Sequence, residues 1–301
     1  MGAALRAEPV DAARRSAGIA LLAATAVGWG LNWPVMKLVL QHWPPMLARG
    51  SAGMVAAFGL GVLALARGDA LAVPRAVAPR LLAAAGFNVT AFMGFSTLAL
   101  LWLDAGEAAL LVYTMPIWAL LLAWPLRGLR SDFAAITAAL LGFGGIALLL
   151  GSQGLAIGLH KLPGIGFALG AALLFALGTV AWRTPMPLPP LVSVAWQVGL
   201  GCLPMLAWGL AVELPRWHTS PAGAWLAMAY MTTVPMAVCY LTWFAALQRL
   251  PPQTASMATL LTPVVGVVAA AVALGEPLGL VRWTALVLTL GGVALALRRQ
   301  S

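Results

Sequence analysis

Long, uninterrupted apolar runs restrict the fold of this chain more than any other feature of its sequence. A membrane-spanning helix needs about 20 consecutive, mostly apolar residues. Ten such runs follow one another along the chain: 17–36, 46–66, 79–101, 106–126, 132–150, 162–181, 191–212, 222–246, 253–273 and 279–297. Only 8% of the 301 residues are charged, whereas a water-soluble domain carries about 25%. The sequence therefore predicts an all-α polytopic membrane protein with ten transmembrane helices.

The distribution of positive charge predicts how these helices are oriented. Lys and Arg favour cytoplasmic loops, and a cytoplasmic N-terminus places 12 of the 17 Lys and Arg residues on that side. Both termini are then cytoplasmic, and the full-length first run, which has no small-residue cleavage pattern, is expected to be a retained helix. The net charge of +9 is spread between apolar runs, which indicates lipid rather than nucleic acid as the charged partner. We expect a location in the cell inner membrane.

The two halves of the chain resemble each other at a nearly constant offset of 147 or 148 residues. The matched positions are Thr114-Met-Pro116 with Leu261-Thr-Pro263, Ala99-Leu100 with Ala246-Leu247, Gly144-Gly145 with Gly291-Gly292, and Gly18 and Gly30 with Gly166 and Gly178. Five spans per repeat is an odd number, so the second copy must be inserted upside down, an architecture of secondary transporters with a mid-membrane site. We expect a tail at 1–16, a first five-helix repeat at 17–150, an outer linker at 151–161, a second, inverted repeat at 162–297 and a tail at 298–301.

Several motifs lie within these repeats. They are Gly28-Trp29-Gly30-Leu-Asn32-Trp33-Pro34 in span one, Ala108-Ala109 to Pro116 in span four, Thr254 to Pro263 in span nine, and Gly275-Glu276-Pro277 after it. Together they resemble the EamA-type branch of the drug/metabolite transporter superfamily over nearly the whole chain. The resemblance implies a bacterial exporter, and similar members export aromatic and other neutral amino acids. Glu276 has Leu129 at its repeat counterpart, so we interpret it as a structural charge at a helix end.

Two prolines fall near the centres of spans four and nine. Proline lacks an N–H and its ring clashes with the carbonyl four residues back, so Pro116 and Pro263 should break their helices and free or strain the carbonyls of Val112 and Thr259. Such groups are tolerated at membrane depth only when buried in protein or lining a wet cavity. A packing kink is the alternative, but the repeat-related positions favour helix breaks that line a cavity and take part in gating.

Polar and aromatic residues at the same depth are the candidates for substrate contact: Trp29, Asn32, Asn88, Tyr113, Trp118, Tyr240 and Trp243. A buried amide is costly unless hydrogen-bonded, so the two asparagines either join helices or face the cavity. Trp and Tyr combine a large apolar surface with a polar group, yet they are also enriched at membrane interfaces. Aromatic residues nearer the span ends are therefore assigned to that interfacial belt: Trp33, Trp43, Trp102 and Trp217.

The charges that the spans lack narrow the choice of cargo. None of the eight acidic residues lies mid-span, whereas a proton-driven cation exporter needs a buried carboxylate. Phosphorylated cargo would call for Lys or Arg inside the cavity, and the deepest candidate, Arg49, lies near the outer end of its span. A neutral or zwitterionic solute is therefore expected.

The sequence contains no pattern typical of a membrane enzyme or a cofactor protein. The three histidines fall in outer loops and no intramembrane protease motif occurs. Lys37 and Lys161 lie near span ends, where neither suits a retinal Schiff base, and Cys202 and Cys239 match no metal or redox spacing. No catalytic residue, metal site or cofactor is expected.

We predict a secondary transporter that exports small neutral or zwitterionic metabolites, with amino acids as the first choice of cargo. The alternatives are a broad-specificity exporter of neutral drug-like compounds and a passive facilitator, and a small-molecule receptor is a weaker option. Polar groups matched to an ammonium and a carboxylate would favour amino acids, and a purely apolar cavity would favour drug-like cargo. The sequence leaves the oligomeric state open.

Overall fold

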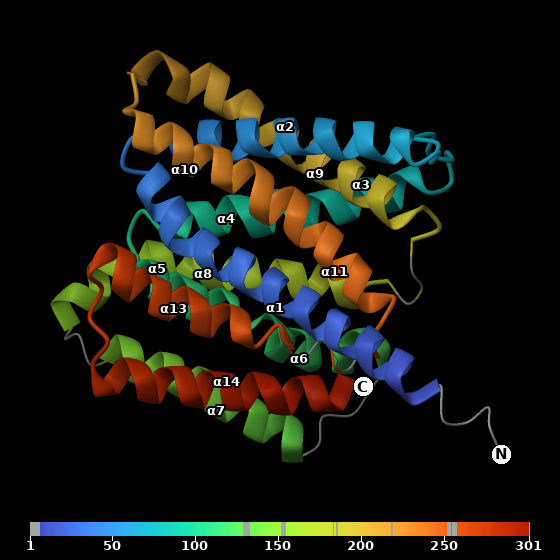
Figure 1. Cartoon of the computed structure of the whole chain (residues 1–301). Coiled ribbons are helices and arrows are strands. Elements are labelled where there is room, and N and C mark those ends of the chain that lie inside the picture. Colours follow the sequence, from blue (N-terminus) through green and yellow to red (C-terminus); the bar gives the residue numbers. More distant parts are fainter. Residues whose placement is uncertain are drawn as a thin grey trace.

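The structure is a computed structural model that describes residues 7–128, 133–151, 155–182, 184, 186–217, 219–251, 254 and 258–300. Within these residues the chain is helical and contains no strand (Figure 1). Its α-helices are α1 (Ala7–Val39), α2 (Pro45–Ala66), α3 (Ala78–Ala85), α4 (Phe92–Ala99), α5 (Ala105–Val112), α6 (Met115–Arg127), α7 (Phe133–Gly151), α8 (Leu155–Val180), α9 (Pro190–Trp208), α10 (Ala222–Thr233), α11 (Cys239–Leu247), α13 (Leu261–Leu274) and α14 (Leu280–Gln300). Three π-helical stretches (Gly86–Ala91, Gly209–Glu213 and Val234–Val238) and a 3₁₀ turn (Leu214–Arg216) continue these helices.

The lengths of the helices confirm a polytopic membrane protein. In the described part of the chain, eight helical segments are long and apolar enough to cross a membrane. Two shorter apolar helices, Ile136–Leu149 and Leu261–Leu274, occupy the places of spans five and nine. The expected span at 253–273 is shortened because Thr259 and Leu260 form a turn before α13. Ten crossings therefore remain a prediction.

Corresponding helices of the two repeats run in opposite directions. Lys37, near the end of α1, donates a hydrogen bond to the Leu103 carbonyl, and Lys161, near the start of α8, pairs with Glu107. Since Leu103 and Glu107 are close in sequence, α1 ends where α8 begins. Figure 1 shows the start of α1 and the end of α14 together at the other end of the bundle. We call that end the terminal end, and we call the end with Lys37 and Lys161 the distal end.

Local irregularities also repeat between the halves. The π-helical stretch that begins at Gly86 corresponds to the one that begins at Val234, 148 residues later. Left-handed glycines end two corresponding helices, Gly128 after α6 with φ 70° and Gly275 after α13 with φ 69°. Glycine adopts this conformation without the steric cost that a Cβ brings. The two halves therefore share helix breaks as well as helices.

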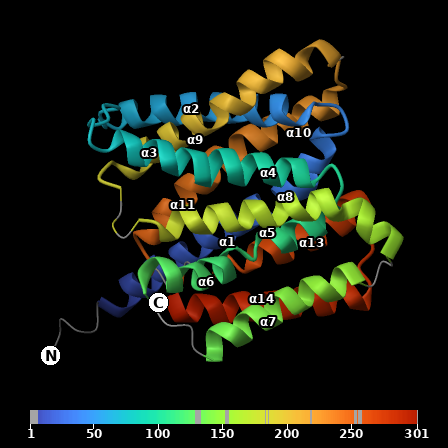
Figure 2. The same ribbon diagram turned by 180° about the vertical axis from the view of Figure 1, so that it is seen from behind.

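The repeats interlock instead of standing side by side. α1 packs mainly against α13, α11 and α10 of the second repeat, and α8 packs mainly against α4, α6 and α5 of the first. α2 lies against its own counterpart α9, and α7 lies against α14. Figures 1 and 2 place these two pairs on opposite sides of the bundle, with α1, α8 and α13 between them. This arrangement brings residues of both repeats to the centre.

Candidate functional site

A cavity of about 530 Å³ lies between the two repeats. Its wall is formed by α1, α2, α4, α6, α8, α11 and α14, by the π-helical stretch at Val234–Val238, and by the turns at Tyr113 and Thr259. Arg49, early in α2, and Met36, late in α1, line it toward the distal end, and Leu297, late in α14, lines it toward the terminal end. The cavity therefore lies between the two ends of the bundle.

Six of the nine residues selected from the sequence line this cavity: Trp29, Asn32, Tyr113, Pro116, Tyr240 and Trp243. Their side chains come from three parts of the first repeat and one helix of the second. The structure brings these six residues together around one cavity. Whether they contact a substrate stays a prediction.

The other three selected residues do not line the cavity. Asn88 lies in the π-helical stretch Gly86–Ala91, where its Nδ2 is 3.5 Å from Oε1 of Gln197 in α9. Asn88 thus takes the helix-joining role that the sequence left as its alternative. Trp118 packs edge-on against Phe143 with ring centroids 5.1 Å apart, and Pro263 is buried in α13.

Seven of the 20 residues that line the cavity are aromatic. Trp29 meets Tyr240 and Trp243 with ring centroids 5.8 Å apart in each pair. The Trp29 indole Nε1 donates a 3.0 Å hydrogen bond to the carbonyl of Pro235, at the π-helical stretch of the second repeat. This bond fixes the indole across the boundary between the repeats.

Trp33 is a wall residue that the sequence analysis placed wrongly. It was assigned to the interfacial belt, but it is 5% exposed and lines the cavity. Its ring meets Tyr113 with centroids 6.4 Å apart. Trp33 follows Trp29 by four residues, a spacing that puts both on one face of a helix. That spacing was the signal that could have identified it.

The helix breaks at Pro116 and Pro263 take a different form from the one expected. α5 ends at Val112, and the chain turns through Tyr113 and Thr114 before α6. The Thr259 carbonyl accepts the Thr262 N–H at 3.1 Å, so the prediction that it would be free is wrong. A tight turn with a bond to the third residue along the chain satisfies it, as at many helix ends.

Two polar residues that line the cavity carry buried polar atoms without a hydrogen-bond partner among the described residues. Asn32 Oδ1 is buried and has no hydrogen-bond partner among the described residues. Arg49 is 5% exposed, and its Nε and Nη1 lack partners in the same part of the chain. The sequence analysis expected no cation in the cavity, and Arg49 corrects that expectation. Arg49 is one of the residues that line the cavity although it lies near a span end.

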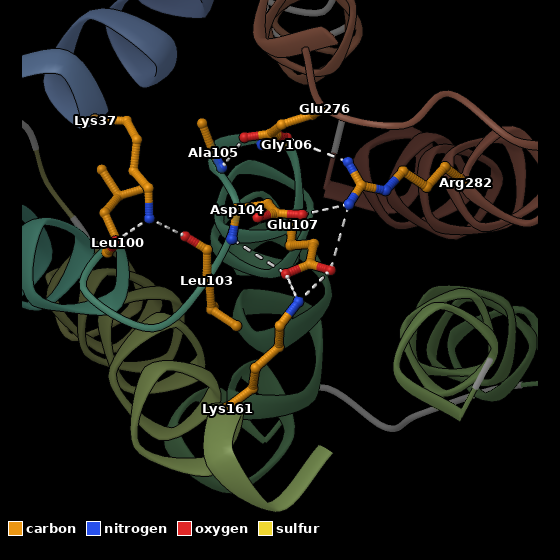
Figure 3. Close-up of polar contacts among 10 residues, drawn as sticks. All are labelled: Lys37, Leu100, Leu103, Asp104, Ala105, Gly106, Glu107, Lys161, Glu276 and Arg282. Atoms are coloured by element: carbon orange, nitrogen blue, oxygen red, sulfur yellow. Dashed lines mark hydrogen bonds and ion pairs between the residues drawn. The ribbon is translucent and has the colours of Figure 1, made fainter. Parts of the chain in front are cut away.

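A network of charged side chains closes the distal end (Figure 3). Glu107 in α5 pairs with Lys161 of α8 at 2.7 Å and with Arg282 of α14 at 3.6 Å. Arg282 also pairs with Asp104 and, at 3.2 Å, with Glu276. The network therefore ties the two repeats together at the end remote from the termini.

Glu276 is a structural charge, as expected from its lack of a repeat counterpart. Its carboxylate accepts hydrogen bonds from the backbone N–H groups of Ala105 at 2.6 Å and Gly106 at 3.1 Å. These are unpaired donors at the start of α5, where a negative charge also complements the helix dipole. Burial raises the pKa of Glu276, and the hydrogen bonds from Gly106 and Ala105 oppose that rise.

A second cavity, of about 560 Å³, is lined by apolar side chains of α1 and α13 and by Tyr230. One of its residues, Val272, is 83% exposed, so this is a groove on the outer surface that faces lipid. In the described residues no group of three or more His, Cys, Asp or Glu side chains could hold a metal ion. The cavity between the repeats is the candidate site.

A polytopic helical bundle of two interlocked, inverted repeats with a mid-membrane cavity has the architecture of a membrane transporter. Comparison with known families identifies which kind. The profile of the EamA-like transporter family matches residues 16–151 and again 162–298, and the chain belongs to this family. The two matched segments correspond to the two predicted repeats.

Curated relatives of similar length are also named as transporters. The chain is 28% identical to the uncharacterized transporter YvbV of Bacillus subtilis, over 91% of this chain and 90% of that one. It is 29% identical to a probable amino-acid metabolite efflux pump of Salmonella typhimurium (93% and 94% covered), and 28% identical to a probable terminal-alkyne amino-acid exporter of Streptantibioticus cattleyicolor (92% of each). A crystal structure of a protein with 23% identity superposes with a TM-score of 0.65, covering 95% of this chain and 99% of that one, and shows a shared fold.

Proposed function

We propose that this protein is an inner-membrane secondary transporter that exports small neutral or zwitterionic metabolites, with amino acids as its cargo. In this proposal both termini are cytoplasmic and no cofactor takes part. Two similar proteins carry names that refer to amino-acid efflux or export. Their names support the direction of transport and the class of cargo.

The observation that carries the proposal is the chemistry of the cavity wall. Seven of the 20 lining residues are aromatic, as suits an apolar side chain of the cargo. The polar groups of Asn32, Ser96, Thr179 and Arg49 lie on the same wall. A wall with these groups favours an amino acid over a neutral drug-like compound, because a purely apolar cavity would be expected for drug-like cargo.

Alternating access is the transport mechanism that we propose. Inverted repeats of this kind expose a central site to each side in turn by rocking against each other. The charge network around Glu107 and the packed core around Trp43 and Leu103 lie at the distal end. Exposing the cavity there requires these contacts between the repeats to separate, whereas the Leu297 end belongs to the terminal side.

Counterflow in proteoliposomes tests this function. Purified protein is reconstituted, the vesicles are loaded with unlabelled phenylalanine, and uptake of a trace of labelled phenylalanine is measured with and without a proton gradient. We expect uptake above that of protein-free vesicles, and uptake without a gradient would indicate exchange or facilitated transport. If no neutral amino acid exchanges but uncharged aromatic compounds do, the amino-acid proposal is wrong and the drug-like alternative is favoured.

A further inference from the structure

Arg49 supplies the cavity with a fixed positive charge. Of the side chains that the structure describes around this cavity, Arg49 is the one with a formal charge. It is 5% exposed, and Nε and Nη1 have no hydrogen-bond partner in the described residues. A buried ion is very costly unless it is paired and hydrogen-bonded. The guanidinium therefore requires a negatively charged, hydrogen-bonding partner.

Within the described chain, no carboxylate lies close enough to pair with Arg49. Asp104, Glu107 and Glu276 are held in the distal network by Lys161 and Arg282. Glu213 accepts the backbone N–H of Leu47 at 2.7 Å and forms no ion pair with Arg49.

Tyr240 lines the same cavity as Arg49, and the thiol of Cys202 packs against Gly53 of the same helix. A thiol and a phenol are both neutral at physiological pH in the absence of an activating cation or base. The protein itself therefore leaves the positive charge of Arg49 without a negative partner.

The packing of α2 on α9 prevents the Arg49 side chain from rotating away from the cavity toward a negatively charged partner elsewhere. Its neighbour Gly50 lies so close to α9 that a Cβ would overlap the backbone nitrogen of Leu206, and a Cβ at Gly53 would overlap the sulfur of Cys202. This close packing fixes the rotation of α2 about its own axis. The Arg49 side chain is thereby held toward the cavity.

We propose that Arg49 is the carboxylate-binding residue of the transport cavity, so that the transported solute must carry a free carboxylate. A guanidinium presents a planar set of donors that matches the two oxygens of a carboxylate. One cation balances one negative charge, whereas a doubly charged phosphate would leave one charge unbalanced. Asn32 Oδ1, a buried acceptor on the same wall, suits the ammonium of an amino acid. This inference rests on the proposed function and specifies its substrate class.

Paired ligands that differ only at the carboxylate test the inference on the full-length protein. Thermal unfolding in detergent is measured with phenylalanine and phenylalaninamide, and with benzoate and benzamide. We expect each acid to raise the unfolding temperature and to bind at least about tenfold more tightly than its amide, as a charge-assisted hydrogen bond predicts. Equal binding of acid and amide by the wild type would overturn the proposal, and so would a folded wild type that binds none of the acids.

Variants assign the effect to this residue. Arg49→Gln should abolish the preference for acids and Arg49→Lys should keep part of it, because Lys retains the charge without the planar fork. Arg249→Gln removes a charge from an exposed side chain outside the cavity and should behave as wild type. If Arg49→Gln does not fold, the binding of each acid is compared with that of its amide in Arg49→Lys and in the wild type. An acid preference that is no weaker in Arg49→Lys than in the wild type then contradicts the proposal. A preference for acids that survives in folded Arg49→Gln contradicts the proposal.

Transport assays separate this inference from the proposed function. If phenylalanine counterflow occurs in the wild type and is unchanged in Arg49→Gln, the function stands and the role of Arg49 is wrong. If no amino acid exchanges but benzoate still binds in an Arg49-dependent way, the carboxylate site stands and the choice of amino acids is wrong.

Discussion

Lys161, in α8, places its ammonium 2.7 Å from the buried carboxylate of Glu107, in the first repeat. Glu107 lies at the start of α5 and Lys161 at the start of α8, and the residues between them include the whole of α6 and α7. Arg282 reaches the same carboxylate from α14 at 3.6 Å. One carboxylate thus connects three helices at the distal end of the bundle.

Removal of Lys161 should therefore be more damaging than removal of both partners. Lys161→Met removes the 2.7 Å ion pair of the buried Glu107 carboxylate, and the loss of one partner of a buried pair costs about 3–5 kcal/mol. The double variant Lys161→Met/Glu107→Gln removes the uncompensated charge and should recover part of the unfolding temperature. Thermal unfolding in detergent measures both. A double variant less stable than the single one would show that Glu107 is not held mainly by Lys161.

The ionisation of Glu276 should make stability depend on pH. Burial raises its pKa in the folded state, so the folded protein binds this proton more tightly than the unfolded chain, whose Glu has a pKa near 4.3. Its contribution is then most favourable in acid and is lost as pH rises through the folded pKa. The unfolding temperature of the wild type relative to Glu276→Gln should rise as pH falls from about 7.5 to about 5. Parallel pH profiles of the wild type and Glu276→Gln would contradict the buried environment of this carboxylate. Asp69→Asn, at a residue that follows the end of α2, serves as a control.

Two glycines of α2 should respond in opposite directions to the same substitution. A Cβ at Gly53 would overlap the sulfur of Cys202, whereas a Cβ at Gly59 meets nothing within 4 Å. Gly53→Ala should destabilise the protein by about 1–3 kcal/mol through overpacking. Gly59→Ala should stabilise it by about 0.5–1 kcal/mol, because alanine has the better helix propensity. Unfolding temperatures of the two variants, purified in parallel, check the packing of α2 on α9.

The two asparagines should separate transport from stability. Asn32 lines the cavity, and Asn88 contacts Gln197 away from it. Asn32→Ala should therefore raise the KM for counterflow about tenfold, in line with one lost hydrogen bond to a charged group. Asn88→Ala should lower the unfolding temperature and leave KM unchanged. If Asn88→Ala raises KM at matched protein amounts while Asn32→Ala does not, the assignment of the cavity wall is wrong.

The apolar runs predicted most of the helices because the length of a span is set by the thickness of the bilayer. The run at 46–66 corresponds to α2 (Pro45–Ala66) and the run at 79–101 to the segment Ala78–Ala99. Depth along the spans selected six residues that the structure places on the cavity wall. Both kinds of prediction depend on distance along the chain.

The predictions that failed depend on rotation about a helix axis. Arg49 was judged by its depth along the span, but the packing of Gly50 and Gly53 on α9 determines which way its face points. Asn88 lies in a π-helical stretch, and the extra residue per turn changes the register of the following side chains. Neither the partner helix nor the π turn is visible in a pattern of apolar residues, so both outcomes required the structure.

The interlocking of the two repeats separates the units of sequence from the units of folding. α1, the first helix of the first repeat, has its main packing partners in α13, α11 and α10, and α2 has its partner in α9. Translation of the first repeat alone therefore supplies neither helix with the surface that it covers in the finished molecule. Until the second repeat is inserted, the surfaces of α1 and α2 that pack on it are in contact with lipid. A fragment that ends after α7 would be a complete family repeat and still only part of a folding unit.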